Sequence, residues 1–139
     1  MRTTMDTLEM PQFAMLDSLC YQVNDVLDAM SADSGIRLST LKVDGGAAAN
    51  NYLLQTQADI SNAPVERPSS VETTALGAAY LAGLAVGFWS GPEELAKKHA
   101  IDKMFVPDIS EEERRKRLRG WHKAVRCAYN WARDDDEDE

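Results

Sequence analysis

Apolar residues between positions 12 and 33 recur at the three- and four-residue spacing that predicts an amphipathic helix. The positions that carry this spacing are Phe13, Leu16, Leu19, Cys20, Val23, Leu27 and Met30. Gly35 follows them, and glycine readily takes the left-handed conformation in which many helices end. Residues 1–11 show no clear periodicity and end at Pro11. We therefore expect one helix over residues 12–33.

Similar patterns predict further helices over residues 51–60, 69–87, 93–100 and 110–132. Asn50 or Asn51 is a plausible N-cap of the first of these, and S-x-x-E capping boxes begin at Ser69 and Ser110. The most apolar run of the chain, residues 75–89, has 15 residues. Because a membrane-spanning helix needs about 20, this run predicts a buried core helix and no membrane span.

Several side chains of these helices mark expected packing positions. Small residues at 79, 83 and 87 share one helix face, which predicts close packing against another helix or a sheet. Cys20 and Cys127 both fall on predicted apolar faces, so we expect buried, reduced thiols in a cytoplasmic protein. The tryptophans are expected to be packing anchors and are Trp89, Trp121 and Trp131.

Only two stretches read convincingly as strands. Residues 38–44 place Leu41 and Val43 on one face, and residues 64–68 form at best a very short or edge strand because prolines flank them. Residues 104–107 look merely extended. Helices alternating with strands predict an α/β fold, but two strands do not make a stable sheet. We therefore expect a helix-rich domain whose sheet is incomplete, with the missing strands lying before residue 1 or supplied by an oligomer.

Charge adds little to this picture. The net charge of −8 comes mostly from the six acidic residues at 134–139, which we expect to be a disordered tail. The rest of the chain is close to neutral, so nothing in the charge balance indicates a nucleic-acid partner. The only histidines, His99 and His122, make a histidine-based zinc site improbable. The basic residues at 114–119 alternate with acids, which is typical of a solvated helix face, with a protein-binding surface as the alternative.

Candidate chemistry is concentrated in residues 41–51, which read LKVDGGAAANN. Consecutive glycines between a strand and a helix let backbone approach a ligand closely, and the following helix start offers unpaired N–H groups. The motif is neither a G-x-G-x-x-G fingerprint nor a P-loop, so a purely structural turn is equally compatible with it. Asn50 lies one turn beyond Gly46, where its amide could meet a base edge or simply cap the helix. Asp44 is better explained as a turn residue than as a catalytic base.

Three segments together resemble the FGGY family of carbohydrate kinases, and within it the glycerol kinases. They are VDGGAAANNYLLQTQADI, PVERP and ETTALGAAYLAGLAVGFW. The resemblance extends over residues 14–133 and matches the C-terminal part of the family's nucleotide-binding domain, while residues 1–13 lie outside it. It implies part of an actin-like, ribonuclease-H-like ATPase fold.

The resemblance also implies roles for individual residues. Gly46 and Asn50 would contact the adenosine part of ATP, with Gly45 and Ala47 shaping the turn. The whole enzyme would transfer the γ-phosphoryl group of ATP to glycerol with Mg²⁺, which is mainly positioning and charge neutralisation. Glu113 is the nearest positional match to a family glutamate that joins a regulator's zinc site, although its surroundings differ.

The resemblance implies equally what this chain lacks. The family's phosphate-binding turn, glycerol-binding residues, catalytic aspartate and magnesium ligands lie in segments that are not present. We therefore expect the chain alone to be inactive and to bind ATP weakly, with the rest of a kinase chain as its partner. Two alternatives stay open: a non-catalytic helical module that binds a partner or self-associates, and a part of another FGGY sugar kinase.

Overall fold

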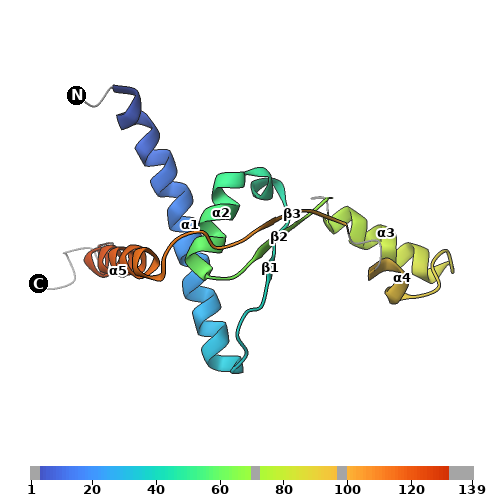
Figure 1. The fold of residues 1–139 in the computed structure, drawn as a ribbon. Helices are drawn as coiled ribbons and strands as arrows, with labels where there is room; N and C mark the ends of the chain where they lie inside the picture. Colours follow the sequence, from blue (N-terminus) through green and yellow to red (C-terminus); the bar gives the residue numbers. More distant parts are fainter. Residues whose placement is uncertain (1–3, 70–72, 97–99, 132–139) are drawn as a thin grey trace, which may run out of the picture. The chain divides into compact units, whose positions relative to one another are not determined.

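The computed structural model describes residues 4–69, 73–96 and 100–131. Its sheet has three strands in the order β1-β2-β3 (Figure 1), namely β1 (Leu41–Lys42), β2 (Val65–Pro68) and β3 (Ile101–Phe105). Strand β1 pairs with β2 in parallel, and β3 pairs with β2 antiparallel. Residues 64–68 are expected to form an edge or very short strand, and β2 is indeed short, with four residues. The edge alternative is wrong, because β2 is the central strand. The flanking prolines permit this, since one precedes the strand and the other ends it where the register shifts.

The third strand, β3, comes from a region that the sequence marked only as extended. Its burial shows why: Ile101 and Met104 are each 49% exposed, and of the five residues only Phe105 is buried. A strand with so little buried surface lacks the apolar alternation by which strands are recognised. The pairing with β2, rather than a sequence pattern, places these residues in the sheet.

Helix α1 (Thr4–Ser34) begins earlier than the predicted residue 12 and contains Pro11. A proline removes only one backbone N–H donor, and the turns on either side carry the remaining helical hydrogen bonds. The other end agrees with the prediction, because Gly35 has a φ of 70° and its N–H donates to the Ser31 carbonyl at 2.9 Å. The helix therefore has the expected C-terminus and a longer N-terminal half.

The core lies between the sheet and helix α2 (Asn51–Ser61), which α1 also contacts. Its buried members come from both elements and from the turn between them; they are Ala48, Leu54, Ala58, Val65 and Phe105. Leu41 and Val43 pack against this cluster, which confirms that they share a face. Helices α1 and α2 are joined by the Cys20 thiol, which donates to the Leu53 carbonyl at 3.5 Å.

Helices α3 (Thr73–Ala85) and α4 (Pro92–Ala96) follow, and the predicted capping box at 69–72 lies largely outside the described residues. The prediction of a buried core helix is wrong for this chain, since none of the residues of α3 is buried and Leu81 is 71% exposed. One part of its small face is covered: a Cβ added to Gly83 would lie 2.1 Å from the Trp89 ring. Trp89 thus acts as the expected packing anchor.

Residues 109–139 form a second unit, whose described helix is α5 (Glu111–Cys127). The Ser110 hydroxyl accepts from the Glu113 N–H at 3.2 Å, which confirms the N-cap, but the helix ends five residues before the predicted 132. No residue of α5 is buried, Cys127 is exposed and Trp131 is 88% exposed. The predictions of a buried stripe, a buried Cys127 and a packed Trp131 are therefore wrong within this chain. No helix among the described residues has the length and hydropathy needed to cross a membrane.

Candidate functional site

The chain leaves β1 through Asp44 and turns sharply at Gly45. Gly45 has φ 84° and ψ 176°, a backbone conformation that residues with a Cβ rarely adopt. The turn leads directly into a short 3₁₀ helix, η1 (Gly46–Ala49). The first glycine of the predicted pair is therefore required by the fold itself.

Gly46 differs, because neither its backbone conformation nor a neighbour among the described residues requires a glycine there. Its φ lies outside the left-handed range, it is exposed, and a Cβ added to it would have no neighbour within 4 Å. The first internal bond of η1 runs from the Ala48 N–H to the Gly45 carbonyl at 3.1 Å. Among the described residues, the N–H groups of Gly46 and Ala47 have no acceptor, so both point to a ligand or solvent.

Asn50 is the N-cap of α2. Its Oδ1 accepts from the N–H groups of Tyr52 at 3.0 Å and Leu53 at 3.2 Å, which confirms the helix-cap interpretation. Its side-chain nitrogen, Nδ2, has no hydrogen-bond partner among the described residues, and the residue is exposed. The amide therefore uses its oxygen for the fold while its two N–H donors stay accessible.

Arg67 supports this turn from β2, and sequence reasoning missed it. Its Nη1 donates to the carbonyl of Ala48 at 3.0 Å and to Oδ1 of Asn51 at 2.9 Å. Its Nε donates to Oδ2 of Asp102 at 2.8 Å. The arginine inside the quoted PVERP segment was the one available signal, but its partners are 16 to 35 residues away in sequence.

Asp44 takes part in a long-range contact rather than a local turn bond. Its carboxylate accepts a hydrogen bond from the hydroxyl of Thr73, the first residue of α3. Among the described residues, Asp44 has no other hydrogen bond or ion pair. Asp44 thus links the strand end to α3.

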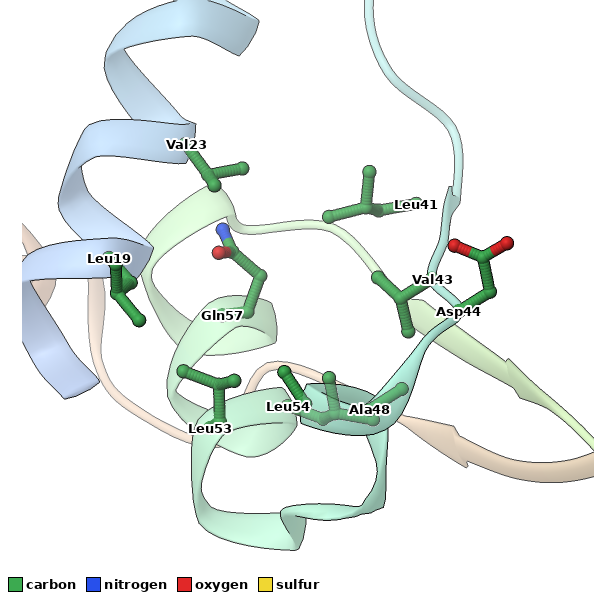
Figure 2. A pocket seen from close by; sticks show the side chains of 10 residues that line it. Leu19, Val23, Leu41, Val43, Asp44, Ala48, Leu53, Leu54 and Gln57 are labelled. Carbon is green, nitrogen blue, oxygen red and sulfur yellow. The ribbon is translucent and has the colours of Figure 1, made fainter. Parts of the chain in front are cut away.

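An apolar pocket of about 230 Å³ lies behind the turn, between α1, β1 and α2 (Figure 2). Its wall is mainly aliphatic and includes Leu19, Val23, Leu41, Val43, Leu53 and Leu54. Gln57 also lines it, is only 6% exposed, and its Nε2 has no hydrogen-bond partner among the described residues. A buried amide nitrogen without an acceptor costs free energy. The Gln57 side chain is therefore unfavourable where it lies unless a further group accepts a hydrogen bond from it.

Buried Cys20 lies under the same region. Burial, followed by the nearby charge of Asp17, raises the pKa of its thiol from 9.0 to about 12. A thiol with so high a pKa carries almost no thiolate at neutral pH and is a poor nucleophile. Cys20 is therefore a structural residue rather than a reactive one.

The carboxylate of Glu113 on α5 is occupied by basic neighbours. Arg117 donates to it at 3.0 Å and Lys116 lies 3.7 Å away, and both lower the pKa of this exposed carboxyl, Arg117 by its hydrogen bond most strongly. Nowhere in the described ranges do three histidine, cysteine, aspartate or glutamate side chains gather as a metal site would need. The role of Glu113 in a shared zinc site stays a prediction.

Sequence comparisons place this chain among carbohydrate kinases. Residues 3–86 match the FGGY family of carbohydrate kinases, C-terminal domain. The chain is 62% identical over 122 residues to glycerol kinase of Agathobacter rectalis and 59% identical over 125 residues to that of Aliivibrio fischeri. These matches cover 88% and 90% of the chain but only 24% and 25% of the relatives. The chain thus spans about a quarter of the length of the curated relatives it matches.

Solved structures agree with the sequence matches. Plasmodium falciparum glycerol kinase with ADP superposes with a TM-score of 0.75 at 33% identity, over 84% of this chain and 23% of that one. Xylulose kinase from Rhodospirillum rubrum matches with a TM-score of 0.67 at 18% identity, over 85% of this chain and 24% of the other, which supports the fold alone. The predicted α/β fold, part of an actin-like, ribonuclease-H-like ATPase domain, is thereby confirmed. This chain belongs to the FGGY family of carbohydrate kinases.

Proposed function

We propose that this chain supplies the adenosine-binding turn of a glycerol kinase, which converts ATP and glycerol to ADP and glycerol 3-phosphate. The observation that carries the proposal is the exposed turn at Gly45–Gly46, in a chain 62% identical to a glycerol kinase. Gly46 is a glycine that neither backbone conformation nor protein packing requires. A glycine at this exposed turn leaves room for the close approach of a ligand.

In this proposal each residue of the turn has a separate task. Gly45 makes the bend, Gly46 and Ala47 present their free N–H groups, and Asn50 offers the donors of its Nδ2 to the base or ribose. These groups bind and orient ATP but carry no charge that would stabilise a transferring phosphoryl group. Positioning of this kind is a large part of phosphoryl-transfer catalysis.

The chemical step requires groups beyond those described in this chain. Mg²⁺, when bound, neutralises phosphate charge, and its carboxylate ligands would come from elsewhere in a longer kinase. The catalytic base and the glycerol site would come from elsewhere too. We infer that the kinase segment covers residues 14–133, between residues 1–13 and the acidic tail at 134–139.

The rest of a kinase chain is the partner that this arrangement requires. Strand β1 is hydrogen-bonded to β2 on one side only, so its other edge is open among the described residues. The apolar pocket and the unsatisfied Gln57 amide adjoin β1 and α2. A further segment packed there would bury the aliphatic wall and could supply the carbonyl that Gln57 lacks.

Self-association is a second candidate function, favoured by the exposed apolar side chains outside the core. Leu81 is 71% exposed, Phe88 is 74% exposed and Trp131 is 88% exposed. Apolar surface of this kind promotes association of copies. Light scattering distinguishes the two: a monomer at 100 µM (roughly the range in which weak association shows) argues against self-association.

The kinase function is tested by a chimera in which residues 14–131 replace the equivalent segment of Agathobacter rectalis glycerol kinase. We expect ATP-dependent phosphorylation of glycerol, whereas a folded but inactive chimera would contradict the proposal. The chimera tests nucleotide binding only, because its acceptor site would come from the Agathobacter rectalis part. The 139-residue chain alone is expected to show no glycerol phosphorylation.

Two glycine variants of that chimera isolate the turn. Gly46→Ala should raise the KM for ATP about tenfold or more, because the methyl group enters the space that the nucleotide occupies. Gly120→Ala is the matched control, since a Cβ there also meets nothing within 4 Å and its φ is likewise outside the left-handed range. Equal KM values for ATP in the two variants would show that the turn does not contact the nucleotide.

A further inference from the structure

Arg67 connects three segments through its guanidinium group: the short helix η1, the start of α2, and strand β3. Its Nη1 donates to the Ala48 carbonyl at 3.0 Å, the Asn51 Oδ1 at 2.9 Å and, at the limit of hydrogen bonding, the Ala49 carbonyl at 3.5 Å. Residues 49 and 51 are the two neighbours of Asn50 in sequence. One nitrogen of Arg67 therefore holds the backbone on one side of Asn50 and the side chain on the other.

The other two nitrogens fix the direction of the guanidinium. Nε and Nη2 both bind Oδ2 of Asp102 on β3, at 2.8 and 2.7 Å. The Arg67 side chain is only 15% exposed, and its Cζ lies 5.5 Å from the centre of the Phe105 ring. Ion pairs that are partly shielded from water and share hydrogen bonds are stronger than fully exposed pairs. The guanidinium group is thus held against Asp102 on β3, and this orientation directs Nη1 towards the turn.

Arg67 donates hydrogen bonds to the carbonyl groups that accept none within η1. Within the turn, Gly45 O accepts from Ala48 N–H and Ala47 O accepts from Asn50 N–H. Within the part of the chain that the structure describes, the carbonyls of Ala48 and Ala49, at the end of η1, have no such backbone donor. Because unpaired carbonyls at a helix end need partners, Arg67 completes the hydrogen bonding of this segment.

We propose that Arg67 is a positioning residue for nucleotide binding, which holds η1 and Asn50 in the orientation that presents Gly46 and the Asn50 amide to ATP. This rests on the proposed function of the turn. Asp102 acts with it by aligning the guanidinium. Lysine cannot replace Arg67, because a single ammonium lacks the planar fork that reaches Asp102 and the turn at once.

The first test measures the turn itself, in the 139-residue chain, by amide hydrogen exchange. In Arg67→Lys we expect the protection of the Ala48 and Asn50 N–H groups to fall about tenfold, while amides in the middle of α2 keep theirs. Lys103→Met is the matched control, since Lys103 lies 4.6 Å from the centre of the same Phe105 ring and has no described contact with the turn. Unchanged protection at Ala48 and Asn50 in Arg67→Lys would overturn the proposal.

The second test measures nucleotide binding in the chimera described above. Arg67→Lys should raise the KM for ATP about tenfold and leave the KM for glycerol within about twofold, with Asp102→Asn intermediate. A merely structural role would instead lower the melting temperature while both KM values stay at the parent level, and this would refute the positioning role. If the parent chimera is inactive, the proposed function fails by itself, and the exchange experiment still decides whether Arg67 orders the turn.

Discussion

The helices of this chain fall into two kinds that differ in what surrounds them. The packed region, formed by α1, η1, α2 and the three-stranded sheet, contains every residue of the hydrophobic cluster, and most of the second half of α2 is buried. The exposed helices, α3 and α5, contain no buried residue, although α3 is the more apolar of these two helices. The difference shows that an apolar sequence does not by itself make a helix buried. A helix is buried only where neighbouring elements pack against it.

The cysteines offer the largest expected contrast between the two kinds of helix. Cys20 in α1 is 0% exposed and Cys127 in α5 is exposed. With a maleimide at neutral pH, we expect Cys127 to react at least about a thousandfold faster than Cys20, since Cys20 must await unfolding. Mass spectrometry of the partly labelled chain measures the ratio. Equal rates would mean that α1 does not stay packed on α2.

Leucine-to-alanine substitutions compare the two kinds of helix by their effect on the free energy of unfolding. Leu54 in α2 is 3% exposed, so Leu54→Ala should lower the free energy of unfolding by about 2–5 kcal/mol. Leu81 in α3 is 71% exposed, and Leu81→Ala should change it by less than about 0.5 kcal/mol. Urea denaturation followed by circular dichroism gives both values. A large loss in Leu81→Ala would show that α3 is covered in solution, as in a self-associated form.

Alkaline pH should destabilise the packed region specifically through Cys20. Its folded pKa is about 12 against an ordinary 9.0, so above pH 9 the unfolded chain loses this proton while the folded chain keeps it. Stability is therefore fully present below pH 9 and falls by up to about 1.4 kcal/mol per pH unit above it. Urea denaturation at pH 8 to 10 should show that the free energy of unfolding falls less steeply with pH in Cys20→Ala than in the parent chain. The exposed Cys127→Ala variant serves as control and should keep the parent slope.

Two glycine substitutions should have effects of opposite sign, one in the turn of the packed region and one in the exposed helix α3. Gly45→Ala places a Cβ at φ 84° and should cost about 1–2 kcal/mol. Gly77→Ala lies within α3, where an added Cβ meets nothing within 4 Å, and should favour the helix by about 0.5–1 kcal/mol. Circular dichroism and urea denaturation measure both. A stabilising Gly45→Ala would mean that the turn is not held in this conformation.

Much of the fold was open to prediction because the decisive signals are local. The C-terminus of α1 at Gly35, the cap of α2 at Asn50 and the cap of α5 at Ser110 each depend on residues within a few positions. The glycine turn after β1 is likewise local. Helix α1 was predicted too short because Pro11 looked like a boundary, whereas neighbouring turns carry the helix through it.

The candidate site could be predicted only in part, for the same reason. Gly45, Gly46, Ala47 and Asn50 form one continuous segment, so the sequence identifies them together. Arg67 and Asp102 are brought to that segment by the pairing of β2 with β3, which no local pattern encodes. The third strand was missed as a strand because only Phe105 of its five residues is buried.

By itself the sequence determined the family, the glycine turn, most helix ends and the shared face of Leu41 and Val43, because each of these depends on residue types at short spacing. Only the tertiary structure decided that β2 is central, that Cys20 is buried while Cys127 is not, and that Arg67 completes the hydrogen bonding of the turn. Those properties depend on which segments lie side by side. Burial, strand order and long-range hydrogen bonds exist only once distant parts of the chain have come together.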